Sequence, residues 1–90
     1  MDKRVHVFIY GDVINVGFRS WTLKNATELG LMGWVKNLSG DTVEAIFEGD
    51  KENVEEMVKR CDKGPERSMV DDVEVKWEEA TGEFEDFTVQ

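Results

Sequence analysis

The residues best suited to chemistry lie in one short stretch, GDVINVGFRS, residues 11–20. An apolar run, VHVFIY, precedes it and a helix-like run, SWTLKNATELG, follows it. The first N–H groups of a helix have no acceptor inside the helix, and a strand-to-helix turn can point several of them at one anion. Gly11 and Gly17 permit the backbone angles of such a turn, and Asn15 tolerates a left-handed conformation better than most residues. The stretch therefore predicts a main-chain cradle for an anion.

Arg19 is a cation in the expected first turn of that helix, where the helix dipole favours anions. Its planar guanidinium could hold two oxygens of a phosphate that rests on the N–H groups. Alternatively, the side chain points into solvent, at a cost of about 0.3–1 kcal/mol, or pairs with one of the 20 acidic residues. Spacing alone leaves these interpretations open, and the GxxxxGK[ST] pattern of nucleotide-binding loops is absent.

Composition limits the classes of protein and partner. Ninety residues with 40% hydrophobic content predict a single domain over residues 1–90. The net charge of −9 argues against nucleic acid and anionic membranes as partners. No apolar run has the length of a membrane span, and no signal peptide is expected, so we expect a cytoplasmic protein. The single His6 and the single Cys61 lie in separate elements, so no metal site is expected, and Cys61 cannot form an internal disulfide.

The periodicity of apolar residues predicts the elements that must position the cradle. Five strands and two helices are expected, and in chain order they are a strand Lys3–Tyr10, a helix Phe18–Leu29, a strand Leu31–Leu38, a strand through Val43–Phe47, a helix capped by Asp50 and reaching Cys61, a strand through Val73–Trp77 and a short strand Phe84–Val89. This order predicts an α+β fold, the ferredoxin-like βαββαβ sandwich. Its one mainly antiparallel sheet would carry both helices on one face, expose the other face to water and gain a short extra C-terminal strand.

Other noticeable residues favour packing roles. Trp21, Trp34 and Trp77 are expected in the core or half-buried. Residues Glu44, Ile46 and Glu48 fall on the outward alternation of the third strand, which argues against an RNA-recognition domain with exposed aromatics on a basic sheet. Cys61 lies on the apolar stripe of the second helix, so it is poorly placed to act as a nucleophile.

Two segments resemble the signatures of the acylphosphatase family. GDVINVGFR is similar to the pattern G-x-V-Q-G-V-x-F-R, and GWVKNLSGDTVEAIFEG, residues 33–49, is similar to the second family signature. The terminal GEFEDFTV also resembles the last strand of the family. The likeness extends over essentially the whole chain, and its two motifs have the expected separation.

The resemblance implies hydrolysis of a carboxyl–phosphate anhydride to a carboxylate and inorganic phosphate, without a metal or cofactor. The main-chain N–H groups of the loop would bind phosphate, and the loop consists of Ile14, Asn15, Val16, Gly17 and Phe18. Arg19 matches the phosphate-binding arginine of the family, and Asn37 matches the asparagine that positions the attacking water. The implied partners are a small acyl phosphate as substrate and inorganic phosphate as product and inhibitor.

Three positions depart from the family pattern, since Ile14 replaces Gln, Asn15 replaces Gly and Asp41 replaces Gly. If position 15 requires a positive φ, Asn costs about 1 kcal/mol there. These departures keep an alternative open, namely a non-catalytic ferredoxin-like module that binds an anion or a protein partner. We expect a monomer, although an exposed edge strand leaves dimerisation open.

Overall fold

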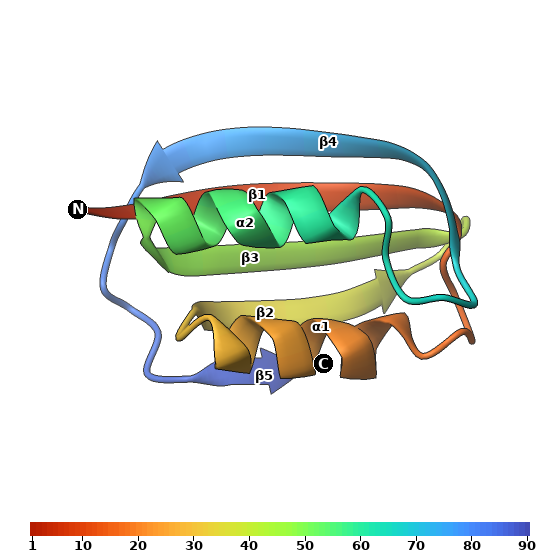
Figure 1. Cartoon of the computed structure of the whole chain (residues 1–90), viewed down its shortest axis with the longest axis horizontal. Helices are drawn as coiled ribbons and strands as arrows, with labels where there is room; N and C mark the ends of the chain where they lie inside the picture. Colours follow the sequence, from red (N-terminus) through yellow and green to blue (C-terminus); the bar gives the residue numbers. More distant parts are fainter.

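The computed structural model describes the whole chain, residues 1–90. It contains five strands and two helices (Figure 1). Their bounds are β1 Asp2–Asp12, α1 Phe18–Glu28, β2 Met32–Leu38, β3 Thr42–Asp50, α2 Lys51–Cys61, β4 Met69–Glu79 and β5 Phe87–Val89. The predicted order of elements is therefore confirmed.

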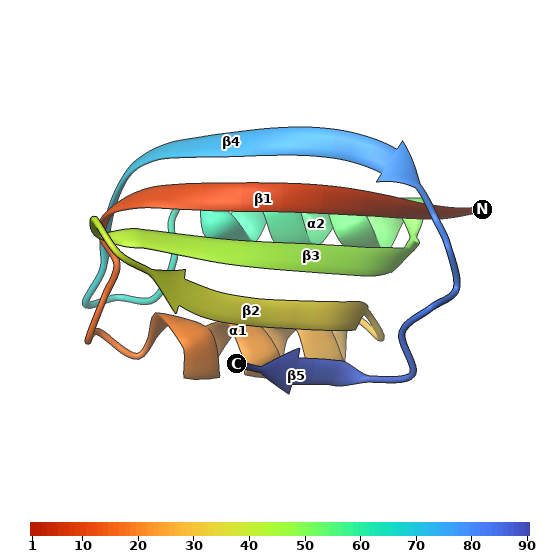
Figure 2. The ribbon, with the colours of Figure 1, turned by 180° about the vertical axis from the view of Figure 1, so that it is seen from behind.

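The strands form a single sheet in the order β4-β1-β3-β2-β5. All neighbours are antiparallel except β2 and β5, which are parallel. Both helices cover one face of this sheet, and Figure 2 shows the opposite face with the helices behind it. This is the predicted ferredoxin-like sandwich. Figure 1 also shows the end of β1, the beginning of α1 and the end of β2 on one side of the molecule.

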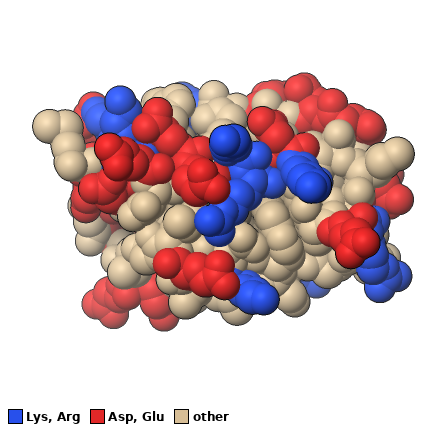
Figure 3. All heavy atoms as spheres, viewed as in Figure 1, with Lys and Arg blue, Asp and Glu red and all other residues tan.

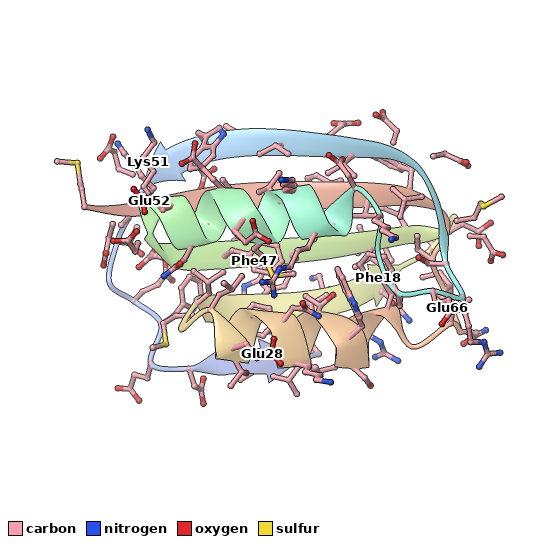
Figure 4. All side chains as sticks on the ribbon, viewed as in Figure 1. Phe18, Glu28, Phe47, Lys51, Glu52 and Glu66 are labelled. Atoms are coloured by element: carbon pink, nitrogen blue, oxygen red, sulfur yellow. The ribbon has the colours of Figure 1, made fainter.

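The core lies between the helices and the inner face of the sheet. Strand β1 contributes Val5, Val7 and Ile9, none of which has exposed surface, because alternate residues of a strand point to the same face. Figure 4 shows Phe47 near the middle of the molecule and Phe18 toward the end where α1 begins, and both belong to the core cluster. Phe18 thereby anchors the beginning of α1 in the core.

The two helices begin differently. The predicted cap of α2 is confirmed, since the Asp50 side chain accepts a hydrogen bond from the Glu52 N–H at 3.0 Å. Helix α1 begins after Gly17, which has φ 79°, makes no side-chain cap and is followed by no acidic residue in the first turn. The N–H groups and the dipole at the start of α1 are therefore not satisfied by any capping side chain.

The last strand is shorter than predicted, because β5 begins at Phe87 rather than Phe84. The segment from Ala80 to Asp86 connects the β4 edge to the β5 edge across the end of the sheet (Figure 2), so it has no strand to pair with. Glu48 fixes this segment, since its carboxylate accepts from the N–H groups of Thr81 at 3.1 Å and Gly82 at 2.8 Å.

The outward face of β3 is less exposed than expected. Ile46 is 4% exposed and Glu48 5% exposed, although both lie on the face opposite the helices. Glu44 on the same face binds His6 Nε2 at 2.6 Å. Neighbouring side chains and the 80–86 segment therefore cover much of this face. Trp77 differs in the other direction, because it is 45% exposed on the edge strand β4 instead of half-buried.

The surface has the acidic character of the sequence. On the helix-bearing face, acidic side chains are widely spread, and basic ones gather near the middle with others at the left and right edges (Figure 3). Neither helix is long and apolar enough to cross a membrane.

Candidate active site

The loop between β1 and α1 presents main-chain donors that the protein does not use. The N–H groups of residues 14–17 donate to no acceptor within the protein. Two residues of the loop have left-handed backbone angles, Asn15 with φ 62° and Gly17 with φ 79°. Alternation of such angles with ordinary ones turns successive N–H groups toward one point and forms an anion-binding nest. Position 15 therefore does require the positive φ under which asparagine carries a cost there.

The apolar side chains of the loop hold it in place. Ile14 and Val16 are half-buried and pack against the core cluster, and Val13 is 1% exposed. Asn15 and Gly17 between them are exposed. The sequence VINVG thus alternates anchoring residues with residues that adopt positive φ, which keeps the loop amides at the surface without a protein partner.

Arg19 lies in the first turn of α1 and is half-buried. Its Nη1 donates to the main-chain oxygen of Gln90 at 3.0 Å, and no carboxylate lies within ion-pairing distance of it. The other N–H groups of the guanidinium have no acceptor within the protein. Of the alternatives to phosphate binding by Arg19, the structure shows neither a pairing with an Asp or Glu side chain nor a fully solvated side chain. Instead, the residue after β5 orients the guanidinium.

Asn37 lies near the end of β2 and makes no side-chain hydrogen bond to the protein. Its Oδ1 is buried and has no hydrogen-bond partner. A buried acceptor without a partner costs about 1–3 kcal/mol, so such atoms are rare in folded proteins. Asn37 therefore keeps a polar group available for a donor that comes from outside the chain.

These features meet at one hollow of about 70 Å³, which has room for a small anion or a few water molecules. Its lining consists of Val13, Asn15, Gly17, Phe18, Arg19, Ser20 and Asn37. The structure thus brings Arg19 and Asn37 together with three of the five predicted loop residues. Ile14 and Val16 belong to the loop but do not line the hollow.

Ser20 and Gln90 were not predicted at the site. Ser20 follows Arg19 in the first helical turn, so the expected helix start was a signal that could have identified it. The contribution of Gln90 is a main-chain oxygen, for which the sequence contains no signal.

Three larger hollows lie elsewhere, and the two largest are lined by charged side chains of both signs. One, of about 520 Å³, is open and lies beside Trp77, where Lys3 is paired with Glu79 at 3.3 Å. Another, of about 390 Å³, lies between the helices, where Arg60 binds Glu56 and Asn25, each at 2.9 Å. Each of these two hollows has acidic side chains in its lining, which would oppose an anion, whereas no acidic side chain lines the small hollow and the loop N–H groups beside it have no acceptor.

Cys61 does not line the small hollow. Cys61 has no exposed surface, and burial raises the pKa of its thiol to about 12, which keeps it protonated and unreactive. No three side chains among His, Cys, Asp and Glu converge as a metal site.

Known proteins resemble this chain in sequence and in fold. The family model of acylphosphatase matches residues 5–89. The acylphosphatase of Trichormus variabilis is 53% identical over 79 residues, which are 88% of this chain and 78% of that protein. Among solved structures, the Coxiella burnetii acylphosphatase superimposes with a TM-score of 0.93 at 32% identity, covering 99% of this chain and 93% of that one. The Bacillus subtilis acylphosphatase gives a TM-score of 0.94 at 28% identity, covering 100% and 99%. On the match of the family model across nearly its whole length, this chain belongs to the acylphosphatase family of hydrolases.

Proposed function

We propose that this acylphosphatase hydrolyses small acyl phosphates by direct attack of water on phosphorus. Arg19 and the N–H groups of loop 14–18 hold the phosphoryl group, and Asn37 orients the water. One observation carries this proposal. Arg19 and Asn37 line a single hollow beside four main-chain N–H groups without acceptors.

The phosphoryl group is held by charge and by aligned donors. A guanidinium and a set of N–H groups bind the oxygens of a phosphate, and the dipole of α1 adds positive potential at the same point. Helix α1 has neither a capping side chain nor an acidic residue in its first turn, so nothing in the chain competes with the anion. Fixed donors of this kind stabilise charge on the phosphoryl oxygens in the transition state.

Asn37 acts by position rather than by removing a proton. A carboxamide oxygen accepts a hydrogen bond, and its NH₂ group donates one, but neither group is a base near neutral pH. The buried Oδ1 would accept from the attacking water and the NH₂ group would donate to an oxygen. Water forms the new P–O bond, and the bond from phosphorus to the acyl oxygen breaks. The carboxylate leaves with that electron pair, and the protons of the water pass to phosphate and solvent.

A carboxylate is a good leaving group, so the reaction requires no protein nucleophile, no metal and no cofactor. Residues of the β1–α1 loop, α1 and β2 line the hollow. Its small volume accommodates the phosphoryl group and leaves the acyl part outside.

Replacement of Arg19 tests the proposal. In a phosphate-release assay with benzoyl phosphate and excess chelator, Arg19→Ala should lower kcat/KM by about 100- to 1,000-fold and weaken inhibition by phosphate. Arg19→Lys should retain part of the phosphate affinity, because the charge remains without the planar fork. Arg67→Ala is the matched control, since Arg67 is an exposed arginine outside the hollow. Parent-like turnover in Arg19→Ala would show that the proposal is wrong.

A further inference from the structure

We infer that the side chain of Asn15 is an additional ligand-binding group of this site, which donates from its carboxamide NH₂ to an oxygen of the bound phosphoryl group. The inference rests on the proposed function and concerns a residue at which the chain departs from the family pattern. It assigns Asn15 a contact that its main-chain N–H alone would not make.

The position of Asn15 supports this contact. Asn15 lines the same hollow as Arg19 and Asn37. Its side chain is exposed and makes no hydrogen bond within the protein, so its NH₂ group is free for a ligand. It is close to the donors that hold the phosphoryl group, because it lies in the loop whose N–H groups are unpaired.

The backbone conformation at position 15 limits the residue types that can occupy it without strain. At φ 62° glycine would be free of strain, whereas a residue with a side chain pays for this conformation. Asparagine is among the least costly alternatives, so tolerance explains how it can occupy the position. The low strain of asparagine gives it no advantage over glycine at this position, whereas a hydrogen bond from its side chain to the ligand would.

The charge of the protein makes a neutral donor useful here. The chain has a net charge of −9, and Arg19 is the only cation that lines the hollow. A phosphoryl group presents several acceptor oxygens, and an NH₂ group adds a donor without a counter-charge. An aspartate of the same shape would instead place a second negative charge beside the anion.

Two variants separate a contact from mere tolerance. Asn15→Gly removes the side chain and keeps the backbone angle, while Asn15→Asp keeps the shape and replaces the donor by a carboxylate. Binding of inorganic phosphate is measured by calorimetry at fixed ionic strength, and kcat and KM are measured with benzoyl phosphate. Asn15→Gly should weaken phosphate binding about five- to tenfold and raise KM similarly, with less than about a twofold change in kcat. Asn15→Asp should bind more weakly still, and salt should reduce the difference between the two.

Asp41→Gly is the control for the backbone, because Asp41 is the other non-glycine residue with positive φ, at 53°, and does not line the hollow. Both glycine variants should melt at or above the temperature of the parent. Asp41→Gly should not weaken phosphate binding, since loss of its negative charge could only favour an anion. Phosphate affinity of Asn15→Gly equal to that of the parent would overturn the inference.

The calorimetric measurement keeps this inference separate from the proposed function. A parent protein that binds phosphate but releases none from benzoyl phosphate overturns the function, while the affinities of the variants still decide the role of Asn15. A parent protein that binds no phosphate overturns both.

Discussion

Replacement of Asn37 by alanine should abolish most turnover without destabilising the protein. The Asn37 side chain makes no hydrogen bond to the protein, and its buried Oδ1 has no partner. The folded state therefore carries the cost of removing this acceptor from water and recovers nothing from protein contacts. Truncation of a buried polar side chain usually costs stability, so the expected outcome is unusual and specific to this arrangement.

The size of both effects follows from the site. An unpaired buried acceptor costs about 1–3 kcal/mol, and the lower value applies here because Asn37 as a residue is only half-buried. Loss of the packing of the carboxamide offsets part of the gain, so the net change lies between zero and about +1 kcal/mol. For a chain of this length, 1 kcal/mol corresponds to about 4–8 °C in melting temperature. A water that is no longer oriented should lower kcat about 100-fold, or about 2.7 kcal/mol in activation free energy.

Thermal melting and benzoyl phosphate hydrolysis measure the two effects, and phosphate inhibition should remain near the parent value. Asn25→Ala is the matched control. Asn25 donates to the Trp21 carbonyl at 2.8 Å and accepts from Arg60 at 2.9 Å, outside the hollow. Its loss should cost about 1–2 kcal/mol of stability and leave kcat unchanged. If Asn37→Ala keeps the parent kcat, or is destabilised as much as Asn25→Ala, the reasoning fails.

Three further outcomes are expected. Glu48→Gln should destabilise the protein by roughly 1–3 kcal/mol, because only one of the two side-chain atoms that accept from the Thr81 and Gly82 N–H groups remains an acceptor. Each kcal/mol lost corresponds to about 4–8 °C in melting temperature, which a thermal melt measures. A hydrogen bond from Arg4 lowers the pKa of Glu83 below its usual 4.5, so its stabilisation is present above pH 4.5 and disappears as pH falls through the lowered pKa. The melting temperatures of the parent and Glu83→Gln should therefore converge in acid. Cys61, with a pKa of about 12, should resist iodoacetamide at pH 8 in the folded protein and react in denaturant, which mass spectrometry measures.

Local patterns were sufficient to predict most of the fold. The apolar run within Lys3–Tyr10 predicted a strand, and β1 includes these residues, with Val5, Val7 and Ile9 fully buried. Asp50 was identified as a cap because its side chain acts on an N–H group two residues away. Features of this kind depend on neighbours in the sequence, so they can be inferred without the tertiary structure.

The errors of the prediction arise where distant segments meet. Residues 84–86 were assigned to the last strand, but Glu48 from β3 binds the main chain of Thr81 and Gly82 just before them, and the segment lies beyond the sheet neighbours it would need. Ile46 was assigned to the exposed face by its alternation, yet it is 4% exposed because residues of other strands surround it. Neither contact is encoded by spacing within the segment itself.

The candidate site also has some features that depend on neighbours in the sequence and others that depend on distant segments. The glycines and Arg19 suggested the cradle, because their chemistry is local to one turn. The unpaired state of Asn37 Oδ1 and the hydrogen bond from Arg19 to Gln90 depend on the position of β2 and β5 beside α1. The sequence identified Arg19 and, through the family resemblance, Asn37 as candidates, but only the structure shows which of their polar groups lack a protein partner.

The two helix starts show why missing partners are informative. Both helices have eleven residues, and each follows a strand of the same sheet. Helix α2 has Asp50 as its cap and Glu52 in its first turn, so its N–H groups and dipole are satisfied by its own sequence. Helix α1 has glycine as its cap and Arg19 in its first turn, which raises the positive potential instead of neutralising it. Only an anion from outside the chain can balance both the free N–H groups and the guanidinium. On this reasoning, Gly17→Asp should abolish phosphate binding. It should also lower the stability of the protein by about 0.5–1 kcal/mol, because the strain of a side chain at φ 79° exceeds the few tenths of a kcal/mol that Asp gains over Gly as a cap. A Gly17→Asp protein that still bound phosphate would show that the start of α1 does not hold the anion.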